Sequence, residues 1–383
     1  MPTTTSTIFC RVNRHRPCRI CGKPDWCIFT RNERISICMR IREGAQKINR
    51  QGGAIFVHED EVIDVREVVE VTQSPIAPTT LRDFVYGRLL ELSPAKLYRS
   101  TLIAGEKGLL ARGFDERHFG NYGALPAEWR ARERITRQLL REASDQFQRT
   151  DSLRGIPGFW EDGCGVHLWK EMDYLAPRLL IPVRDELGRI QACQMRLPFI
   201  AKKGLRYLWL SSSDLPLGVG SGSPLHFKFR LADLPSDAQV VIVEGVLKAD
   251  VLFALRPELF IVATPCVTAN HSALIHLTRK RRVLIAFDQD SYSNKAVCFH
   301  LASLIARRMR SERTLATTRI ASWDRRFKGI DDAAVRNIPI TSISVRSWFD
   351  RLSPHFQQIA LTRFAEFDAF PFQTKKRSGS QGQ

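Results

Sequence analysis

Short, continuous apolar runs alternate with helical patterns in the C-terminal half of the chain. Between residues 239 and 320 the apolar runs are QVVIV, LFIVAT, RRVLIAF and TTRIAS, and segments with helical periodicity separate them. Apolar runs of this length are typical of strands that helices cover on both faces, as in a parallel sheet. The pattern therefore predicts an α/β domain with a parallel sheet over residues 236–340.

The segments before and after this sheet follow other patterns. Residues 81–150 carry apolar positions three and four apart, which predicts a helical region. Residues 151–235 favour short strands, and the run RLLIPVRDELGRIQACQMRL predicts a hairpin that turns near Glu186–Gly188. A mixed α+β subdomain is thus expected before the sheet. After the sheet, residues 341–383 are expected to form a helix around Ser342–Phe370 and a disordered polar tail.

The first 71 residues are distinct in composition. They contain four of the chain's nine cysteines between residues 18 and 38, and the first fifty residues hold eleven Lys or Arg against three Asp or Glu. The next segment, 72–80 (TQSPIAPTT), is rich in Pro and Thr, which favours an extended linker. Residues 1–71 are therefore predicted to form a separate small domain.

The four clustered cysteines have a spacing that suits zinc. Cys18 and Cys21 form a C-x-x-C pair, which lets two thiolates bind one tetrahedral ion. The segment Trp26–Met39 predicts a hairpin in which Cys27 lies opposite Cys38, with Cβ atoms about 5 Å apart. The set predicts a zinc ribbon with a structural Zn²⁺, because four protein ligands leave no open coordination position.

Two alternatives to this zinc site stay open. Cys27 and Cys38 would be ordinary buried strand residues if Cys18 and Cys21 formed a free dithiol. Another side chain would also serve as a substitute ligand if one cysteine lay too far away. The candidate substitutes are Cys10, His15 and His58.

The chain has a formal net charge of +18, which is large for 383 residues. A field of this sign attracts polyanions, so nucleic acid is the expected partner, although a generally basic surface or ribosome association would give the same balance. No apolar run approaches about 20 residues, and the N-terminus lacks the hydrophobic segment of an export signal. We therefore expect a cytoplasmic protein without a membrane span.

Acidic residues follow two of the predicted strands. Glu244 and Gly245 come directly after QVVIV, and Asp288 and Asp290 follow RRVLIAF as a D-x-D pair. The two aspartates point to the same side if the strand end stays extended, and the carboxyl ends of parallel strands meet at one edge of the sheet. Three carboxylates there would hold Mg²⁺ or Mn²⁺ for phosphoryl transfer. Lys248 is either a phosphate contact or a solvated lysine on the following helix.

The order of these acids resembles that of the TOPRIM domain, which bacterial-type primases, topoisomerases and some nucleases share. The resemblance implies a Rossmann-like parallel sheet in which Glu244, Asp288 and Asp290 are the catalytic and metal-binding set. A further acidic motif of primases corresponds to KGIDD, where Asp331 and Asp332 would complete the magnesium site. The alternative role for this last pair is a helix N-cap before AAVRN.

The segment upstream of the sheet narrows the resemblance to bacterial replicative primases. RLLIPVRDELGRIQACQMRL followed by KKGLRYLWLSS is similar to the first half of their catalytic core, and the resemblance covers about residues 175–340. The matching positions are Pro182, Arg184, Asp185, Gly188, Arg189, Arg196, Arg206, Tyr207 and Ser211. The chain most resembles the shortened primase-like proteins of plasmids and other mobile elements. The helical block 81–150 and the cysteine spacing depart from the family pattern.

The resemblance implies a nucleotidyltransferase that makes short primers on a single-stranded DNA template from nucleoside triphosphates. A basic strip before the acidic site is expected, with Lys248, to bind nucleic acid or nucleotide phosphates, unless it is only a solvated hairpin face. The strip consists of Arg184, Arg189, Arg196, Lys202, Lys203 and Arg206. Tyr207, next to Arg206, is also expected to contact nucleic acid or nucleotide. The sequence has no G-x-x-x-x-G-K-[ST] phosphate loop, so unwinding would require a separate helicase.

Two other functions stay open at the level of sequence. Recombination mediators also combine a zinc finger with a TOPRIM domain, and there the domain binds DNA without catalysis. The presence of all three acids here favours chemistry. A TOPRIM nuclease is the second alternative. A type I topoisomerase is disfavoured, because neither Tyr86 nor Tyr98 has a large strand-gate domain around it.

Overall fold

The computed structural model falls into two compact units. The residues that the structure describes are 9–12, 17–24, 26–30, 35–48, 53–58, 75–106, 108–148, 153–162, 164–170, 176–197, 206–313 and 316–369. The smaller unit consists of Met1–Ala77, Ser152–Lys170 and Ser211–Gly220, and the larger unit of Pro78–Asp151, Glu171–Leu210 and Ser221–Gln383. Several residues discussed above lie outside the described ranges, namely His15, Lys202, Lys203, the linker residues 72–74 and the tail from 370. The domain boundaries expected from the sequence stay predictions.

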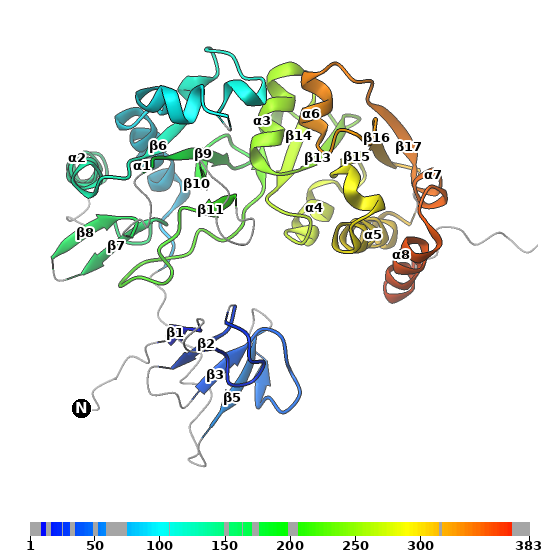
Figure 1. Ribbon diagram of the computed structural model, residues 1–383, viewed down its shortest axis with the longest axis horizontal. Coiled ribbons are helices and arrows are strands. Elements are labelled where there is room, and N and C mark those ends of the chain that lie inside the picture. The colour runs from blue at the N-terminus through cyan, green and yellow to red at the C-terminus, as the bar shows by residue number, and fades with distance from the viewer. Residues whose placement is uncertain are drawn as a thin grey trace, which may run out of the picture. The chain divides into compact units, whose positions relative to one another are not determined.

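The smaller unit is built around an antiparallel sheet. Its strands are β1 (Phe9–Arg11), β2 (Ile28–Thr30), β3 (Ile35–Cys38), β4 (Lys47–Ile48) and β5 (Ala54–Val57). They pair in the order β1-β2-β3-β5-β4 (Figure 1). Ile28 pairs with Ile37, so the next residues, Cys27 and Cys38, meet as the sequence predicts. A hairpin of β7 (Phe159–Asp162) and β8 (Gly165–Leu168) belongs to the same unit.

The larger unit begins with a four-stranded antiparallel sheet. Its strands are β6 (Gly123–Leu125), β9 (Arg178–Arg184), β10 (Ile190–Arg196) and β11 (Tyr207–Trp209), in the order β11-β10-β9-β6. β9 and β10 form the predicted hairpin, and the turn around Gly188 has the positive φ that favours glycine. Helix α1 (Thr79–Leu92) packs on β10, and α2 (Trp129–Phe147) packs on α1. Short turns and β6 interrupt the helical block that the sequence predicts there.

The second sheet of the larger unit has six strands. They are β12 (His226–Phe227), β13 (Gln239–Glu244), β14 (Phe260–Thr264), β15 (Arg282–Ala286), β16 (Thr318–Ser322) and β17 (Thr341–Ser344). The order is β12-β14-β13-β15-β16-β17, with the four central strands parallel and both edge strands antiparallel. The four central strands are those that the apolar runs predict. The two edge strands were not predicted, because β12 is too short and β17 is too polar to form such an apolar run.

Helices cover both faces of the six-stranded sheet. One face packs on α3 (Val246–Leu255) and α6 (Ile330–Val335). The other packs on α4 (His271–Leu277), α5 (Lys295–Glu312), α7 (Val345–Asp350) and α8 (Pro354–Glu366) (Figure 1). The prediction of a single helix around Ser342–Phe370 is wrong. A strand, a short helix and a longer one take its place, and Pro354, which has no backbone N–H to donate, starts the last helix.

Helix α3 is buried on two sides. Val246, Leu247 and Val251 pack into the apolar core beneath the four-stranded sheet, together with residues of β9. Ala249 and Leu252 pack into the core of the six-stranded sheet. One helix is thus shared by both sheets of the larger unit.

The chain is therefore an α/β protein with a mixed, mostly parallel sheet, preceded by antiparallel sheets and an N-terminal group of four cysteines. Within the ranges that the structure describes, no helix combines the length and the apolar character needed to cross a membrane.

Candidate active site

The predicted acidic residues lie at one edge of the six-stranded sheet. Glu244 is the last residue of β13, and Asp288 follows the end of the neighbouring parallel strand β15 by two positions. Asp288 then starts a short 3₁₀ turn, Gln289–Tyr292, so the D-x-D segment is not extended as the sequence argument assumed. The position of the acids at the strand ends agrees with the prediction, but the two aspartates are presented by a turn.

Two lysines hold the aspartates in place. Lys248, in the first turn of α3, donates to Asp288 Oδ1. Lys328 Nζ lies 2.8 Å from Asp290 Oδ2 and 3.7 Å from Asp288 Oδ2. Asp288 is only 6% exposed. Lys248 is therefore not a solvated helix-face residue, since it forms an ion pair with a buried carboxylate.

The acidic side chains retain oxygen atoms that no neighbour satisfies. Among the described residues, Glu244 Oε2 and Asp290 Oδ1 are buried and have no hydrogen-bond partner. Burial raises the pKa of Glu244 to about 7, Lys248 opposes that shift, and Asp288 and Asp290 add to it. Burial also raises the pKa of Asp288, against the effect of Lys248. Unpartnered oxygens and raised pKa values mark a place where a further cation would be stabilised.

The carboxylate oxygens of the cluster suit a hard divalent ion, but they do not form a complete coordination shell for it. Oxygen donors are those that Mg²⁺ and Mn²⁺ prefer, and Mg²⁺ usually keeps several waters and few protein ligands. In the described part of the chain, the only group of three or more candidate ligands with atoms within 4.8 Å of one another is the cysteine group. The carboxylates of Glu244, Asp288 and Asp290 are therefore neighbours, but their oxygen atoms do not all lie within 4.8 Å of one another.

Asp331 extends the acidic cluster toward the four-stranded sheet. It lies in the first turn of α6, is 2% exposed, and accepts from Arg112 Nη1 at 2.7 Å. Its other oxygen, Oδ1, is buried with no partner among the described residues. A Cβ at Gly329 would collide with this oxygen, so a larger residue there would displace the Asp331 carboxylate. The N-cap residue of α6 is Gly329, whereas Asp332 is half-buried on the same first turn.

Arg112 connects the acidic cluster with the basic strands and was not recognised in the sequence. It belongs to a short 3₁₀ turn, and its Nη2 donates to Tyr207 Oη at 3.4 Å. Tyr207 on β11 pairs with Arg196 on β10. Arg196 is 8% exposed, and among the described residues its Nη1 is buried without a partner. Two guanidinium groups thus lie near Asp331, an arrangement that suits phosphate binding.

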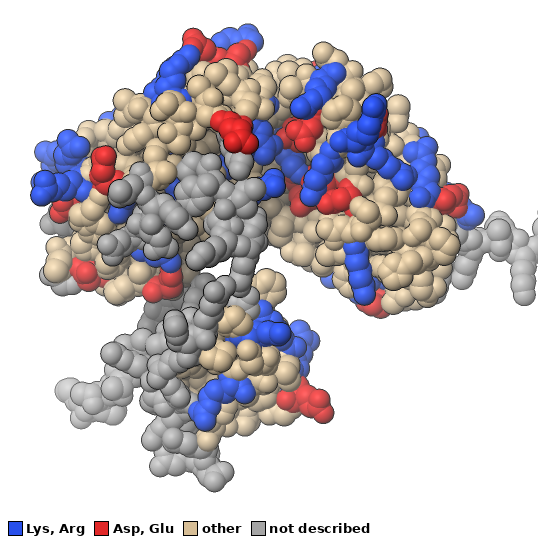
Figure 2. Space-filling view, in the orientation of Figure 1, with Lys and Arg blue, Asp and Glu red and all other residues tan. Residues whose placement is uncertain are grey.

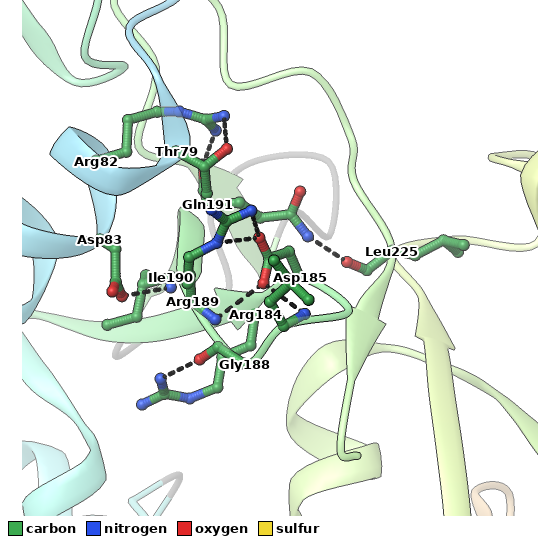
Figure 3. Close-up of polar contacts among 11 residues, drawn as sticks. Thr79, Arg82, Asp83, Arg184, Asp185, Gly188, Arg189, Ile190, Gln191 and Leu225 are labelled. Carbon is green, nitrogen blue, oxygen red and sulfur yellow. Dashed lines mark hydrogen bonds and ion pairs between the residues drawn. The ribbon is translucent and has the colours of Figure 1, made fainter. Parts of the chain in front are cut away.

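Other members of the predicted basic strip have structural roles. Figure 3 shows that Arg189 and Arg184 bind the turn between β9 and β10. Arg189 Nε donates to the buried carboxylate of Asp185 at 2.8 Å, and Arg184 Nη1 donates to the Gly188 carbonyl at 2.9 Å. Arg206 is exposed, and Lys203 lies outside the described residues. Of the predicted basic strip, Arg184 and Arg189 therefore stabilise the hairpin, whereas Arg196 lies near Asp331.

The visible surface of the larger unit is basic without being uniform. Figure 2 shows that Lys and Arg side chains are spread over that face, with Asp and Glu side chains among them. The net charge alone would therefore not have located the site.

A buried network around Asp250 positions α3. The carboxylate of Asp250 accepts from His226 Nε2 at 3.1 Å, from Lys228 Nζ at 2.6 Å and from Tyr122 Oη at 3.0 Å. Burial works against its charge, but Lys228 and His226 keep the pKa of this carboxyl well below its usual range. His226 Nδ1 in turn accepts from the backbone N–H of Arg184 at 2.9 Å. The network joins both sheets to the helix that carries Lys248, and no sequence signal identified it.

The four clustered cysteines form a second site in the smaller unit. Their sulfur atoms all lie within 4.8 Å of one another, and Cys27 Sγ is 3.7 Å from Cys21 Sγ and 3.9 Å from Cys38 Sγ. A tetrahedral zinc with bonds of about 2.3 Å separates its sulfurs by about 3.8 Å. The two sulfur distances of Cys27 therefore match those around a tetrahedral zinc.

The surroundings of the cysteines also suit thiolates. The backbone N–H groups of Arg40 and Ile41 donate to Cys38 Sγ at 3.4 and 3.3 Å. Burial, in contrast, raises the pKa of Cys27 to about 12, so its thiolate would need a bound cation. Of the suggested substitute ligands, His58 is bonded to Ser36 Oγ at 2.7 Å, whereas the Cys10 side chain and His15 lie outside the described structure.

No family model and no curated protein matches the chain. Several solved primase structures are similar to it. The RNA polymerase domain of Mycobacterium tuberculosis primase DnaG, in complex with double-stranded DNA, is 18% identical, covers 76% of this chain and 89% of its own, and gives a TM-score of 0.46. The Aquifex aeolicus primase, with zinc binding and RNA polymerase domains, is 13% identical. The match covers 96% of this chain and 86% of that chain, with a TM-score of 0.45. At such identities the activity of this chain has to be inferred from its own residues.

Proposed function

We propose that the chain is a metal-dependent nucleotidyltransferase of the primase type, which joins nucleotides into short primers on single-stranded DNA. The observation that carries the proposal is the arrangement at the sheet edge. Glu244, Asp288 and Asp290 follow the ends of neighbouring parallel strands, and Lys248 pairs with Asp288. Arg112 pairs with Asp331 and bonds to Tyr207, whose strand partner is Arg196. Acids next to guanidinium groups suit metal-assisted transfer between phosphates more than binding alone.

The residues divide the chemistry among them. Asp288 and Asp290, with Glu244, would hold Mg²⁺ or Mn²⁺. When bound, that ion supplies Lewis-acid stabilisation of the phosphate under attack and activates the attacking hydroxyl. Arg112 and Arg196 would bind phosphate oxygens of the template or the incoming nucleotide.

Proton transfer and charge balance fall to the buried groups of the cluster. Where Glu244 does not hold the ion, burial raises its pKa to about 7, so it would accept a proton at neutral pH through its unpartnered Oε2. Lys248 and Lys328 limit the repulsion between the aspartates before substrate arrives. Asp331 orients Arg112 through their ion pair.

The cysteine group supports a separate role in the same function. We propose that Cys18, Cys21, Cys27 and Cys38 bind one structural Zn²⁺, because the sulfur spacing matches a closed tetrahedral site. The small basic unit that they stabilise would contact the template strand. A separate replicative helicase would supply single-stranded DNA.

Incubation of the full chain with single-stranded DNA, ribonucleoside triphosphates and Mn²⁺ or Mg²⁺ tests the proposal. We expect short oligonucleotides from the wild type and a loss of at least about 100-fold in Asp288→Asn, because the variant lacks a carboxylate that holds the ion. Asp350→Asn is the matched control, since Asp350 is exposed at the end of α7 and pairs with exposed Arg346. Its yield is expected to match that of the wild type.

Three results would speak against primer synthesis. Shortened DNA would indicate a nuclease, and tight DNA binding without any new product would indicate a non-catalytic binding protein. Equal yields from Asp288→Asn and Asp350→Asn would show that the acidic cluster is not the catalytic centre. Parallel assays with deoxynucleotides and with each metal alone define the substrate further.

A further inference from the structure

A cavity of the larger unit lies on the face of the six-stranded sheet opposite α3 and α6. It has a volume of about 480 Å³ and lies among α4, α5, α8 and the loop before α4. Its lining is polar and basic and includes no Asp or Glu. The lining residues are Thr268, Asn270, His271, Ser272, Ala273, His300, Ser303, Arg307 and Arg363. Neither the sequence motifs nor the proposed chemistry uses any of them.

Aromatic rings hold both guanidinium groups of the cavity in position. The guanidinium carbons of Arg307 and Arg363 lie 4.9 and 5.1 Å from the ring centroid of Phe367. Arg363 also lies 4.1 Å from the ring centroid of Phe299, and its Nε donates to Ser303 Oγ at 2.8 Å. Cation–π contacts and this hydrogen bond fix the two groups without neutralising them.

The positive charge of the cavity is not fully compensated within it. Arg363 pairs with Glu366, but Arg307 has no ion pair among the described residues. Arg307 Nε is buried and also lacks a hydrogen-bond partner there. An unsatisfied buried donor is costly, and a bound anion would relieve that cost. The cavity therefore has one basic group in excess and a donor that faces no protein acceptor.

Two imidazole rings line the cavity and would donate to an anion once protonated. The ring centroids of His271 and His300 lie 6.1 Å apart, and His271 Nε2 is 2.7 Å from the Val267 carbonyl. That contact assigns the ring proton to Nε2 in the neutral form. Burial lowers the pKa of both histidines. A bound anion would favour their protonated forms and gain additional charge-assisted contacts.

We propose that this cavity binds a phosphate group of a nucleotide or of a nucleic-acid backbone. Two guanidinium groups held at fixed positions suit the tetrahedral, multiply charged phosphate, which accepts several hydrogen bonds at once. The hydroxyls of Thr268 and Ser272 provide neutral donors at the same lining. The volume admits a nucleotide or one to two backbone phosphates. The site is separate from the acidic cluster and does not depend on the activity proposed for that cluster.

Binding measurements on the full chain without added divalent ions test the proposal, because the acidic cluster then repels phosphates. ATP and inorganic phosphate are titrated by calorimetry, and a fluorescent oligo-dT of about 20 nucleotides is titrated by anisotropy at 0.15 M salt. The test variants are Arg307→Gln, which removes the uncompensated guanidinium, and Ser272→Glu, which adds a carboxylate at the exposed rim without deleting a contact. The controls are Arg310→Gln, an equal charge loss on the exposed part of α5, and Ser272→Gln, the neutral counterpart.

We expect both test variants to weaken phosphate binding about tenfold and both controls to leave it within about twofold. A loss confined to ATP and inorganic phosphate would assign the cavity to a free phosphate compound. A loss confined to the oligonucleotide would assign it to the DNA backbone. If both test variants bind all three ligands as the controls do, or if no ligand binds the wild type, the proposal is wrong. Ser272→Glu guards against misfolding, because the thermal unfolding of this variant should match that of Ser272→Gln.

Discussion

The cysteine group and the acidic cluster are two ways of arranging metal ligands in one chain. The four sulfurs of the cysteine group already lie at the spacing of a tetrahedral ion, and backbone N–H groups point at them. In the acidic cluster Lys248 and Lys328 pair with the aspartates, and among the described residues three carboxylate oxygens, on Glu244, Asp290 and Asp331, have no partner. The first arrangement is complete in its protein ligands. The second leaves positions for substrate and water.

The difference follows from what each site has to do. A structural ion must be bound before the surrounding chain is stable, so its ligands have to converge. A catalytic ion has to exchange ligands during the reaction, which a closed set of four protein donors prevents. Lysine is a suitable temporary counterion, because its flexible side chain can leave a carboxylate without a change in the backbone. Three experiments distinguish the two arrangements.

The largest effect is expected from removal of one sulfur from the closed site. Cys38→Ser should reduce bound zinc from about one per chain to well below half. It should also abolish cooperative folding of the smaller unit, because binding of structural zinc contributes on the order of 10 kcal/mol. Metal analysis and hydrogen exchange of β2 and β3 provide the measurements. Cys164→Ser, at an exposed position outside the group, serves as the control. A variant that keeps a full zinc and native exchange would refute the assignment.

An intermediate effect is expected from the buried charge of the open site. The pKa of Glu244 in the folded chain is about 7, above its ordinary value of 4.5, so the folded state favours the protonated form. The stability that this provides is complete below pH 4.5 and is lost as the pH rises through 7. Glu244→Gln should therefore be more stable than the wild type at pH 8, by about 1 to 3 kcal/mol, and little different at pH 5.

Urea denaturation at both pH values, without divalent ions, measures this difference. Glu258→Gln is the control, because Glu258 is exposed beside Arg256. Parallel stability curves for the wild type and Glu244→Gln across this pH range would show that Glu244 is solvated and not part of an uncompensated cluster.

The smallest effect is expected from the exposed counterion. Lys328→Met removes the cation that lies between Asp288 and Asp290, so Mn²⁺ should bind about two- to fivefold more tightly. Electron paramagnetic resonance of free Mn²⁺ measures this affinity. Lys295→Met, at an exposed position at the start of α5, controls for the loss of one positive charge. Unchanged or weaker binding would mean that Lys328 does not compete with the ion.

The strand arrangement was accessible from the sequence, whereas the contacts between distant segments were not. Apolar runs identified β13 to β16 and placed Glu244 and Asp288 at strand ends, since burial on both faces leaves a direct signal in composition. The Cys27–Cys38 pairing followed from hairpin register alone. These features depend on residues near one another in the chain.

Tertiary partners leave no such signal. Arg112 and Asp331 are 219 positions apart, and nothing in the segments around them indicates an ion pair. The same holds for Tyr122 and Asp250. The roles of Arg184 and Arg189 were also beyond sequence reasoning, because a guanidinium looks alike whether it binds a phosphate or its own turn.

The sharing of α3 between two cores has a consequence for cooperativity. A helix that packs on one sheet can detach while the rest of a domain stays folded, and its amides then exchange through local opening. Since α3 packs into both cores of the larger unit, its detachment would expose apolar surface on two sides. The two sheets are thus joined into one unfolding unit. The backbone position of Lys248, from which its side chain reaches Asp288, is therefore fixed for as long as that unit remains folded.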